Sequence, residues 1–259
     1  MGERRGSCSV ATLRQRCVGA LLISPVLLLI TSLCCGPLQA VPRRLIILRH
    51  GEKANPYALC GIGQQRAIAL RDTYLGRDAT ESVIPPGESP AAFLAMTLHT
   101  VELATPSAQS WGLPVTTYAV VPMEDRPEHV KREQEIESVQ TAAADVLNNP
   151  AWHDRTVVIT WEHSTIAREK LEREHPGEAV TFRQLLHLDT LANVPRSWAG
   201  NNYDYLWIVD YAPEISDQPT GFRLQRQLFP APFQALPHNL WGAPLPADYP
   251  ASCERKVSN

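Results

Sequence analysis

Two histidines stand directly after apolar runs of the sequence. His50 follows the run 45–48 and is preceded by Arg49, and His163 follows the run 156–160. A neutral imidazole can act as a nucleophile or a general base. A guanidinium beside it can hold the oxygens of a phosphate or carboxylate through a planar pair of donors. The pattern predicts a site that binds an anionic group next to a reactive imidazole.

A structural role in the core is the commoner one for any single histidine, and the chain has eight. Two histidines at the ends of apolar runs, one of them next to an arginine, favour the functional interpretation. Arg49 also favours the neutral form of His50, because a nearby positive charge lowers the pKa of an imidazole.

Apolar runs alternate with segments of helical period along the chain. Strands are expected near 45–48, 92–98, 115–121, 156–160, 205–209 and 222–229, and helices over 63–75, 101–111, 128–147, 164–174 and 182–191. This rhythm predicts an α/β fold with a mostly parallel central sheet flanked by helices. Ligands bind beyond the carboxyl ends of such strands, so both histidines would face one cleft if their strands are neighbours.

The composition is that of a globular protein. The chain has 259 residues, of which 44% are hydrophobic and 20% charged, which excludes disordered and collagen-like classes. The proline-rich segments 85–87 and 230–250 are expected to be irregular and to wrap the surface. A single domain over residues 41–259 is expected.

The first forty residues have the layout of a secretory signal peptide. Four arginines precede the apolar run 18–33, and small or polar residues lead to Ala40, where cleavage is expected. The run is shorter than a spanning helix and contains Pro25, although an uncleaved anchor remains the alternative. Cleavage would leave 20 basic and 26 acidic side chains, a net charge of about −6. This charge argues against nucleic acid as a partner.

The distribution of the six cysteines agrees with export. Four lie within the signal segment, and only Cys60 and Cys253 remain in the mature chain. In an oxidising compartment these two are expected to form one disulfide, which would stabilise the fold by about 3–5 kcal/mol because it closes a very long loop. Two unpaired thiols are the alternative.

A family resemblance rests on three segments. The run 45–52, with Arg49-His50-Gly51 near its end, resembles the signature of the histidine phosphatase superfamily, which includes phosphoglycerate mutases and acid phosphatases. Residues 59–67 resemble the start of the family's first helix, and 104–115 its next helix and strand. The similarity covers most of 43–165 and implies the three-layer phosphoglycerate mutase-like fold.

The resemblance also implies a mechanism. His50 would attack phosphorus to form a phosphohistidine that water then hydrolyses, with no metal or other cofactor. Arg49 would bind the phosphoryl oxygens, and His163, which matches the family's second histidine, would donate hydrogen bonds to them in the transition state. Glu52 would either orient this site or be a solvated loop charge.

The sequence departs from the family pattern at the second arginine. The residue at that position is His99, four residues before Leu103-Ala104. An imidazole replaces the charge of an arginine only when it is protonated, so phosphate binding and turnover are expected to be reduced. His99 is interpreted either as a substitute for the arginine in phosphate binding or as a structural residue.

The proton donor is expected between the second strand and the second histidine. Glu124 is the predicted donor, while Asp125 and Glu128 compete with it and Glu162 is a further candidate. An isolated acidic residue in such a segment is more often a loop charge or a helix-start charge than a proton donor.

The predicted function is hydrolysis of a small phosphorylated substrate in the periplasm or outside the cell. One alternative is a catalytically inactive pseudophosphatase that binds a phosphorylated or sugar ligand. Another is a metallohydrolase with His50, His99 and His163 as zinc ligands, which the charge of Arg49 opposes. Lys53 and Lys131-Arg132 could meet a second anionic group, although solvated charges are the expected role of such residues.

Overall fold

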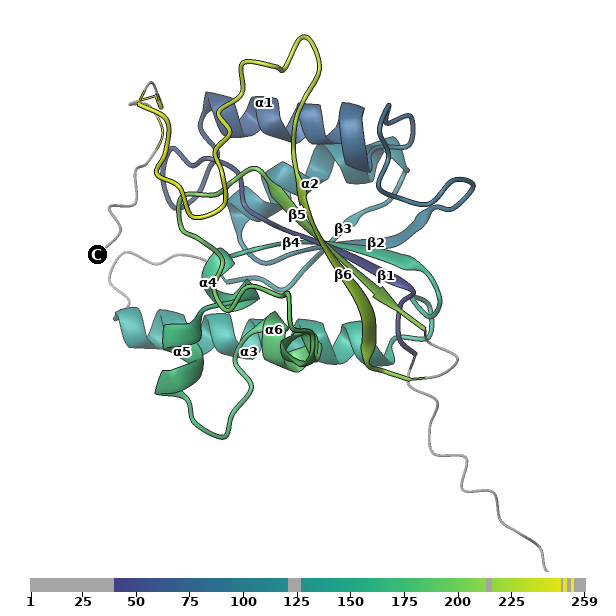
Figure 1. Cartoon of the computed structure of the whole chain (residues 1–259), viewed down its shortest axis with the longest axis vertical. Coiled ribbons are helices and arrows are strands. Elements are labelled where there is room, and N and C mark those ends of the chain that lie inside the picture. The colour runs from purple at the N-terminus through teal and green to yellow at the C-terminus, as the bar shows by residue number, and fades with distance from the viewer. Residues whose placement is uncertain (1–39, 121–126, 213–215, 248, 251–252, 254–259) are drawn as a thin grey trace, which may run out of the picture. The chain divides into compact units, whose positions relative to one another are not determined.

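Six strands form one central sheet in the order β3-β2-β4-β1-β5-β6 (Figure 1). The strands are β1 Arg44–Arg49, β2 Pro90–Ala95, β3 Val115–Thr117, β4 Thr156–Trp161, β5 Tyr205–Tyr211 and β6 Pro219–Arg226. The first four run parallel to one another, and β5 and β6 are antiparallel to their neighbours. The computed structural model describes residues 40–120, 127–212, 216–247, 249–250 and 253, all of which belong to one compact unit.

Helices cover both faces of the sheet (Figure 1). On one face lie α1 Gly61–Leu70, its π-helical continuation η1 Arg71–Leu75, and α2 Leu98–Ser110; on the other lie α3 Glu128–Asn148, α4 His163–Ile166, α5 Glu169–Glu174, α6 Phe182–Leu185 and the 3-10 turn η2 Leu188–Thr190. None of the helices in the described part of the chain is long and apolar enough to cross a membrane. The predicted α/β fold with a mostly parallel sheet between helices is confirmed.

The side chains of β1 point alternately to the two faces of the sheet and contribute to a hydrophobic core on each face. Ile46 and Leu48 belong to one buried cluster, together with residues of α1 and α2, and Leu45 and Ile47 belong to a second cluster, together with residues of α3. Successive side chains of a strand point to opposite faces, so a continuous apolar run is needed when both faces are covered. This explains why 45–48 contains no polar residue.

The prediction of one continuous helix over 164–174 was wrong, because the segment forms two short helices. Ala167 and Arg168 have extended backbones and separate α4 from α5, and Glu162 rather than Ser164 precedes the first turn of α4. The carbonyl of Ala167 accepts a hydrogen bond from the N–H of Trp198 at 2.9 Å. A partner far along the chain thus takes a carbonyl that a continuous helix would use.

Three other predicted elements are shorter in the structure than expected. The second strand ends at Ala95, and Leu98 already belongs to α2, which begins with a capping box of Thr97 and Thr100. The third strand has only three residues, and the helix expected over 182–191 is a single turn that ends before His187, whose φ is +58°.

The chain after β6 returns over the α1 side of the sheet (Figure 1). Arg66 of α1 donates to the carbonyl of Pro237 at 2.7 Å, and Trp241 packs against the core. The predicted disulfide between Cys60 and Cys253 is present, with a Cα–Cα distance of 5.4 Å, and both cysteines are buried. The proline-rich tail therefore follows the surface and is tied to the loop before α1. The predicted signal peptide lies, apart from Ala40, outside the described residues.

Candidate active site

The ends of β1 and β4 bring the two predicted histidines together. These strands are parallel neighbours, and Arg49 pairs in register with Trp161. The N–H of His50 donates to the carbonyl of Trp161 at 3.0 Å, and the ring centroids of His50 and His163 are 5.9 Å apart. His99, at the start of α2, lies edge-on to His50 with centroids 5.0 Å apart. The two histidines are thus neighbours at one edge of the sheet, but His50 is fully buried and only His163 lines a cleft, so the expectation that both face one cleft was wrong for His50.

The hydrogen bonds of His50 specify its tautomer. Its Nδ1 lies 2.7 Å from the carbonyl oxygen of Gly51, which only accepts, so Nδ1 carries a proton. Its Nε2 lies 3.0 Å from Nη2 of Arg49, which only donates, so Nε2 presents a lone pair. The ring is therefore neutral, with the lone pair of Nε2 next to a guanidinium.

Burial is the main reason why His50 stays neutral. The residue is fully buried, and this desolvation lowers the pKa of the imidazole well below its ordinary value. Glu162 opposes the shift, while Arg49, Lys53 and His99 add to it. An imidazole in this environment keeps its lone pair in mildly acidic solution.

Arg49 is held by the loop that precedes β5. Its Nη1 donates to the carbonyl of Gly200 at 2.6 Å and to that of Asn202 at 3.4 Å, and its guanidinium lies 4.0 Å above the centroid of the Tyr203 ring. Tyr203 also contacts the ring of His50, with centroids 5.7 Å apart. Sequence reasoning missed this loop, because nothing in its local pattern marks it as part of a site.

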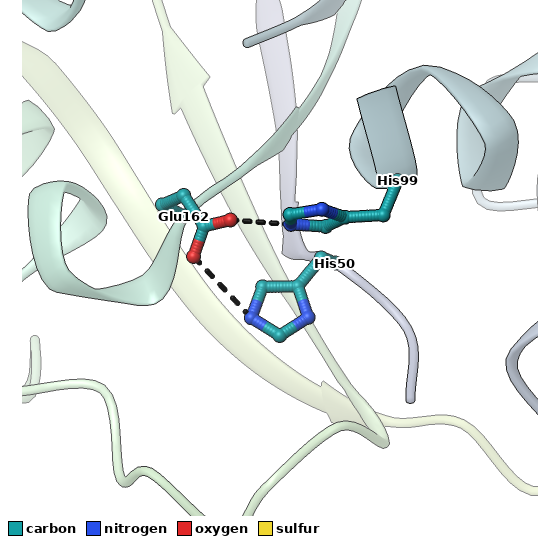
Figure 2. A group of neighbouring side chains, drawn as sticks. All are labelled: His50, His99 and Glu162. Carbon is teal, nitrogen blue, oxygen red and sulfur yellow. Dashed lines mark hydrogen bonds and ion pairs between the residues drawn. The ribbon is translucent and has the colours of Figure 1, made fainter. Parts of the chain in front are cut away.

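Glu162 connects the two buried histidines (Figure 2). One carboxylate oxygen lies 3.4 Å from Nε2 of His50, and the other forms a hydrogen bond with Nε2 of His99. Burial alone would raise the pKa of this carboxyl, but the hydrogen bond from His99 and the positive charge of Lys53 hold it well below its ordinary value. Glu162 is therefore ionised.

His99 faces acceptors on both ring nitrogens. Its Nδ1 lies 3.1 Å from the carbonyl oxygen of Pro56, and its Nε2 faces the Glu162 carboxylate and the Thr97 hydroxyl, the latter at 3.0 Å. A carbonyl oxygen can only accept, so Nδ1 carries a proton, and the hydrogen bond between Nε2 and Glu162 contains a second one. The Nε2 of His99 is thus directed to Glu162.

Glu52 belongs to the support of the site. It is fully buried and forms a two-fold ion pair with Arg66 of α1, with Nη2–Oε1 at 2.5 Å and Nε–Oε2 at 2.9 Å. The interpretation as a solvated loop charge was wrong, because no part of the side chain reaches solvent. Its ion pair fastens the loop after His50 to α1.

A cleft of about 610 Å³ opens beside this group. Glu162 and His163 line it, whereas Arg49, His50 and His99 are at most 2% exposed and lie behind its wall. Five basic side chains line the cleft, against three carboxylates: Lys53, Lys131, Arg132, Arg168 and Lys170, against Glu128, Glu135 and Glu162. Lys53 is buried, so its expected role as a solvated charge was wrong.

The acidic candidates differ in position. Glu124 and Asp125 lie outside the described residues, and Glu128 is an exposed residue at the start of α3. Glu135, which sequence reasoning missed, is buried, lines the cleft and lies 3.3 Å from Nη1 of Arg132. Burial and the negative charge of Glu162 raise the pKa of Glu135.

The donor set of Figure 2 can be compared with the needs of a metal ion. Ligand atoms of His50, His99 and Glu162 lie within 4.8 Å of one another, and two imidazoles with a carboxylate are a common metal-binding set. However, Arg49 donates to the same Nε2 that would have to bind the metal, and Lys53 adds positive charge. The surroundings of Nε2 suit an anion better than a cation.

No family model matches the chain, and no curated protein matches it. Solved structures similar to it include a candidate phosphohistidine phosphatase from Agrobacterium tumefaciens (14% identity, 73% of this chain, 99% of the other, TM-score 0.36). A candidate alpha-ribazole-5'-P phosphatase from Escherichia coli is 13% identical over 71% of this chain and 96% of the other, with a TM-score of 0.40. The mycobacterial glucosyl-3-phosphoglycerate phosphatase is 16% identical over 71% of this chain and 97% of the other, with a TM-score of 0.38.

Proposed function

We propose that this protein is a histidine phosphatase that hydrolyses a phosphomonoester through a phosphohistidine on His50. The observation that carries the proposal is the hydrogen-bond geometry of the His50 ring. Its Nδ1–H is held by the Gly51 carbonyl, and its Nε2 lone pair lies 3.0 Å from the Arg49 guanidinium. The nucleophilic atom and a phosphoryl-binding group are thus adjacent before any substrate arrives.

The reaction has two displacements at phosphorus. In the first, a bond forms between Nε2 of His50 and phosphorus, and the ester P–O bond breaks with its electron pair going to the leaving oxygen, which takes up a proton. In the second, water attacks phosphorus, loses a proton, and displaces His50 to release inorganic phosphate. Arg49 and His163 stabilise the charge shared among the phosphoryl oxygens in both steps.

The cleft supports a small anionic substrate. It is lined by more cationic than anionic side chains, and it leads to His163 and Glu162 at the ends of the catalytic strands. A phosphate monoester carries negative charge at neutral pH, so this lining raises its local concentration. Nucleic acid is not proposed as a partner, since the mature chain would carry a net negative charge.

The protein is proposed to act outside the cytoplasm. Residues 1–40 would be removed as a signal peptide, and the Cys60–Cys253 disulfide supports an oxidising compartment. Sequencing the N-terminus of protein exported by a bacterial host should give Val41. Retention of the full chain in the membrane fraction would support the alternative of an uncleaved anchor.

The decisive experiment is to trap the intermediate. The mature chain is mixed with an aryl phosphate and quenched without acid, and mass spectrometry locates any phosphoryl group. The adduct is expected on His50 in the parent and in His163→Ala, where its breakdown is slower, and is expected to be absent in His50→Ala. An adduct on another residue, or full activity of His50→Ala, would refute the mechanism.

The second candidate function is a pseudophosphatase. It is favoured by the burial of His50, which is 0% exposed, and by the presence of His99 at the second arginine position. In that case inorganic phosphate would bind to the mature chain while an aryl phosphate stays intact at every pH from about 4 to 9. The metallohydrolase alternative predicts loss of activity with a strong chelator, whereas the proposed mechanism predicts none.

A further inference from the structure

A phosphatase acting on alkyl esters must protonate the leaving oxygen. An alkoxide is a poor leaving group, and a positioned acid accelerates its departure by about 10²–10⁴-fold. Glu162 combines two properties that this role requires. Its carboxylate lies 3.4 Å from Nε2 of His50, and the same side chain lines the cleft. The other carboxylates of the cleft, Glu128 and Glu135, are both paired with Arg132.

The position of Glu162 places it on the path of the substrate. A phosphoryl group joined to Nε2 must occupy space that the carboxylate now borders at 3.4 Å. Since His50 is fully buried and Glu162 forms part of the cleft wall, a substrate coming from the cleft meets Glu162 before His50. The carboxyl group therefore borders the side from which the rest of the ester extends.

The His99–Glu162 pair contains one transferable proton. Nδ1 of His99 carries one proton, because it faces a carbonyl oxygen, and the hydrogen bond between Nε2 and Glu162 contains the other. The same proton on the carboxylate would leave His99 neutral. An arginine at this position could not exchange its proton in this way, because a guanidinium does not lose it in proteins.

We propose that Glu162 is the proton donor of this phosphatase and that His99 is the positioning residue that stores the donated proton. The proposal rests on the proposed function. As the P–O bond breaks, its electron pair goes to the leaving oxygen, which takes the proton through Glu162 and leaves His99 neutral. In the second step the attacking water gives a proton to Glu162, which restores the pair as the His50–phosphorus bond breaks.

The proposal is tested by comparing leaving groups in Glu162→Gln. Glycerol phosphate needs a proton on its leaving oxygen, whereas 2,4-dinitrophenyl phosphate leaves without one. Loss of the acid is expected to lower kcat/KM for glycerol phosphate by about 100-fold or more, and that for the dinitrophenyl ester by less than about 5-fold. Equal loss on both esters would overturn the proposal, because a structural or binding role does not distinguish leaving groups.

Two matched variants control this comparison. Glu135→Gln makes the same change in a buried carboxyl that lines the same cleft, and Glu124→Gln makes it at the donor expected from the sequence. Both are expected to affect the two esters equally. Selective loss on glycerol phosphate in either of them, with none in Glu162→Gln, would assign the donor elsewhere.

His99 is tested by changing its charge and its proton separately. His99→Arg keeps a cation but cannot release its proton, and His99→Gln has neither property. Both are expected to lose activity on glycerol phosphate selectively and to flatten the pH dependence of kcat for that ester. If His99→Arg matches or exceeds the parent on glycerol phosphate, His99 acts only as a phosphate-binding charge and the proposal fails.

The outcome separates this proposal from the proposed function. Trapping with the dinitrophenyl ester is repeated in Glu162→Gln. A phosphoryl group on His50 without any selectivity between esters would leave the proposed function in place and reject Glu162 as the donor. Absence of the adduct in the parent would reject the proposed function itself. Thermal unfolding of each variant, with Glu162→Asp as a second change at this position, identifies loss that comes from misfolding.

Discussion

At the scale of single residues, the two chain neighbours of His50 contact both of its ring nitrogens. The Gly51 carbonyl holds the proton on Nδ1, and the Arg49 guanidinium faces Nε2. Both contacts arise within three consecutive residues, so the arrangement needs little more than the backbone course at the end of β1. Preorganisation of this kind places donors before charge develops in the transition state.

The lowered pKa of His50 predicts how stability depends on pH. Below pH 6.5 the unfolded chain takes up a proton on this residue and the folded protein does not, so the free energy of unfolding falls as pH falls from 6.5 towards the folded-state pKa. The slope from this group is at most about 1.4 kcal/mol per pH unit. His50→Asn should remove this slope from urea unfolding measured between pH 7.5 and about 5.5.

The control for this experiment is His129→Asn, which changes an exposed histidine at the start of α3. Its urea midpoint should follow that of the parent across the same range. A pH dependence that is unchanged in His50→Asn would show that His50 takes up its proton equally well in both states.

Arg49→Lys should reduce catalysis more than its retained charge suggests. A lysine cannot donate to Gly200 and His50 at once or lie flat on the Tyr203 ring. We expect kcat/KM for an aryl phosphate to fall by about 100-fold, within the range for removing one transition-state donor. The control is Arg43→Lys, at an exposed ion pair with Asp154, which should keep kcat/KM within a factor of about 2 of the parent value. A fall of less than about 5-fold in Arg49→Lys would contradict the assigned role.

At the scale of elements, the loop after β1 is fastened to α1 by close backbone packing. A Cβ atom at Gly63 would lie 2.2 Å from the carbonyl oxygen of Glu52, whose side chain forms the buried ion pair with Arg66. The N–H of Cys60 also donates to this carbonyl at 2.9 Å. The loop that follows His50 is therefore placed by contacts with the first turns of α1.

Gly63→Ala should destabilise the protein by about 1–3 kcal/mol, because the new methyl group forces the loop and helix apart. The matched change is Gly61→Ala in the same turn of α1, where a Cβ meets nothing within 4 Å. It should be neutral, or stabilising by up to about 1 kcal/mol. Urea unfolding of the two variants gives the comparison, and equal stability would contradict the close approach.

At the scale of the whole molecule, the disulfide joins residues 193 positions apart. It ties the tail to the loop before α1, and Tyr249, near its end, stacks on Tyr203 with centroids 6.4 Å apart. Tyr203 in turn covers Arg49. The tail thus supports the site from a distance in the sequence that no local motif spans.

Replacing both cysteines by serine should lower the free energy of unfolding by about 3–5 kcal/mol, since a cross-link over so long a loop removes much entropy from the unfolded chain. The measurement is the urea midpoint of the double variant against the oxidised parent. Reduced parent should behave like the variant. A loss below about 1 kcal/mol would mean that the tail contacts alone hold this region.

Local patterns of the sequence were enough to predict the layered α/β fold, the positions of His50 and His163 at strand ends, and the single pair of remaining cysteines. Apolar runs, the residues that follow them and the number of cysteines can be read from the sequence itself, so these features were predictable without the tertiary structure. The break at Ala167 was missed because it depends on a hydrogen bond from the distant Trp198. The end of α6 at Leu185 and the short third strand were missed as well.

Tertiary structure decided which groups surround His50. Glu162 meets His99 across 63 positions, Arg49 meets Gly200 across 151, and Glu52 meets Arg66 instead of solvent. The protonation of each group follows from such partners and from burial, and neither is encoded in nearby residues. The sequence by itself therefore determined that His50 and His163 stand at strand ends, and only the fold decided which groups surround them and where the protons lie.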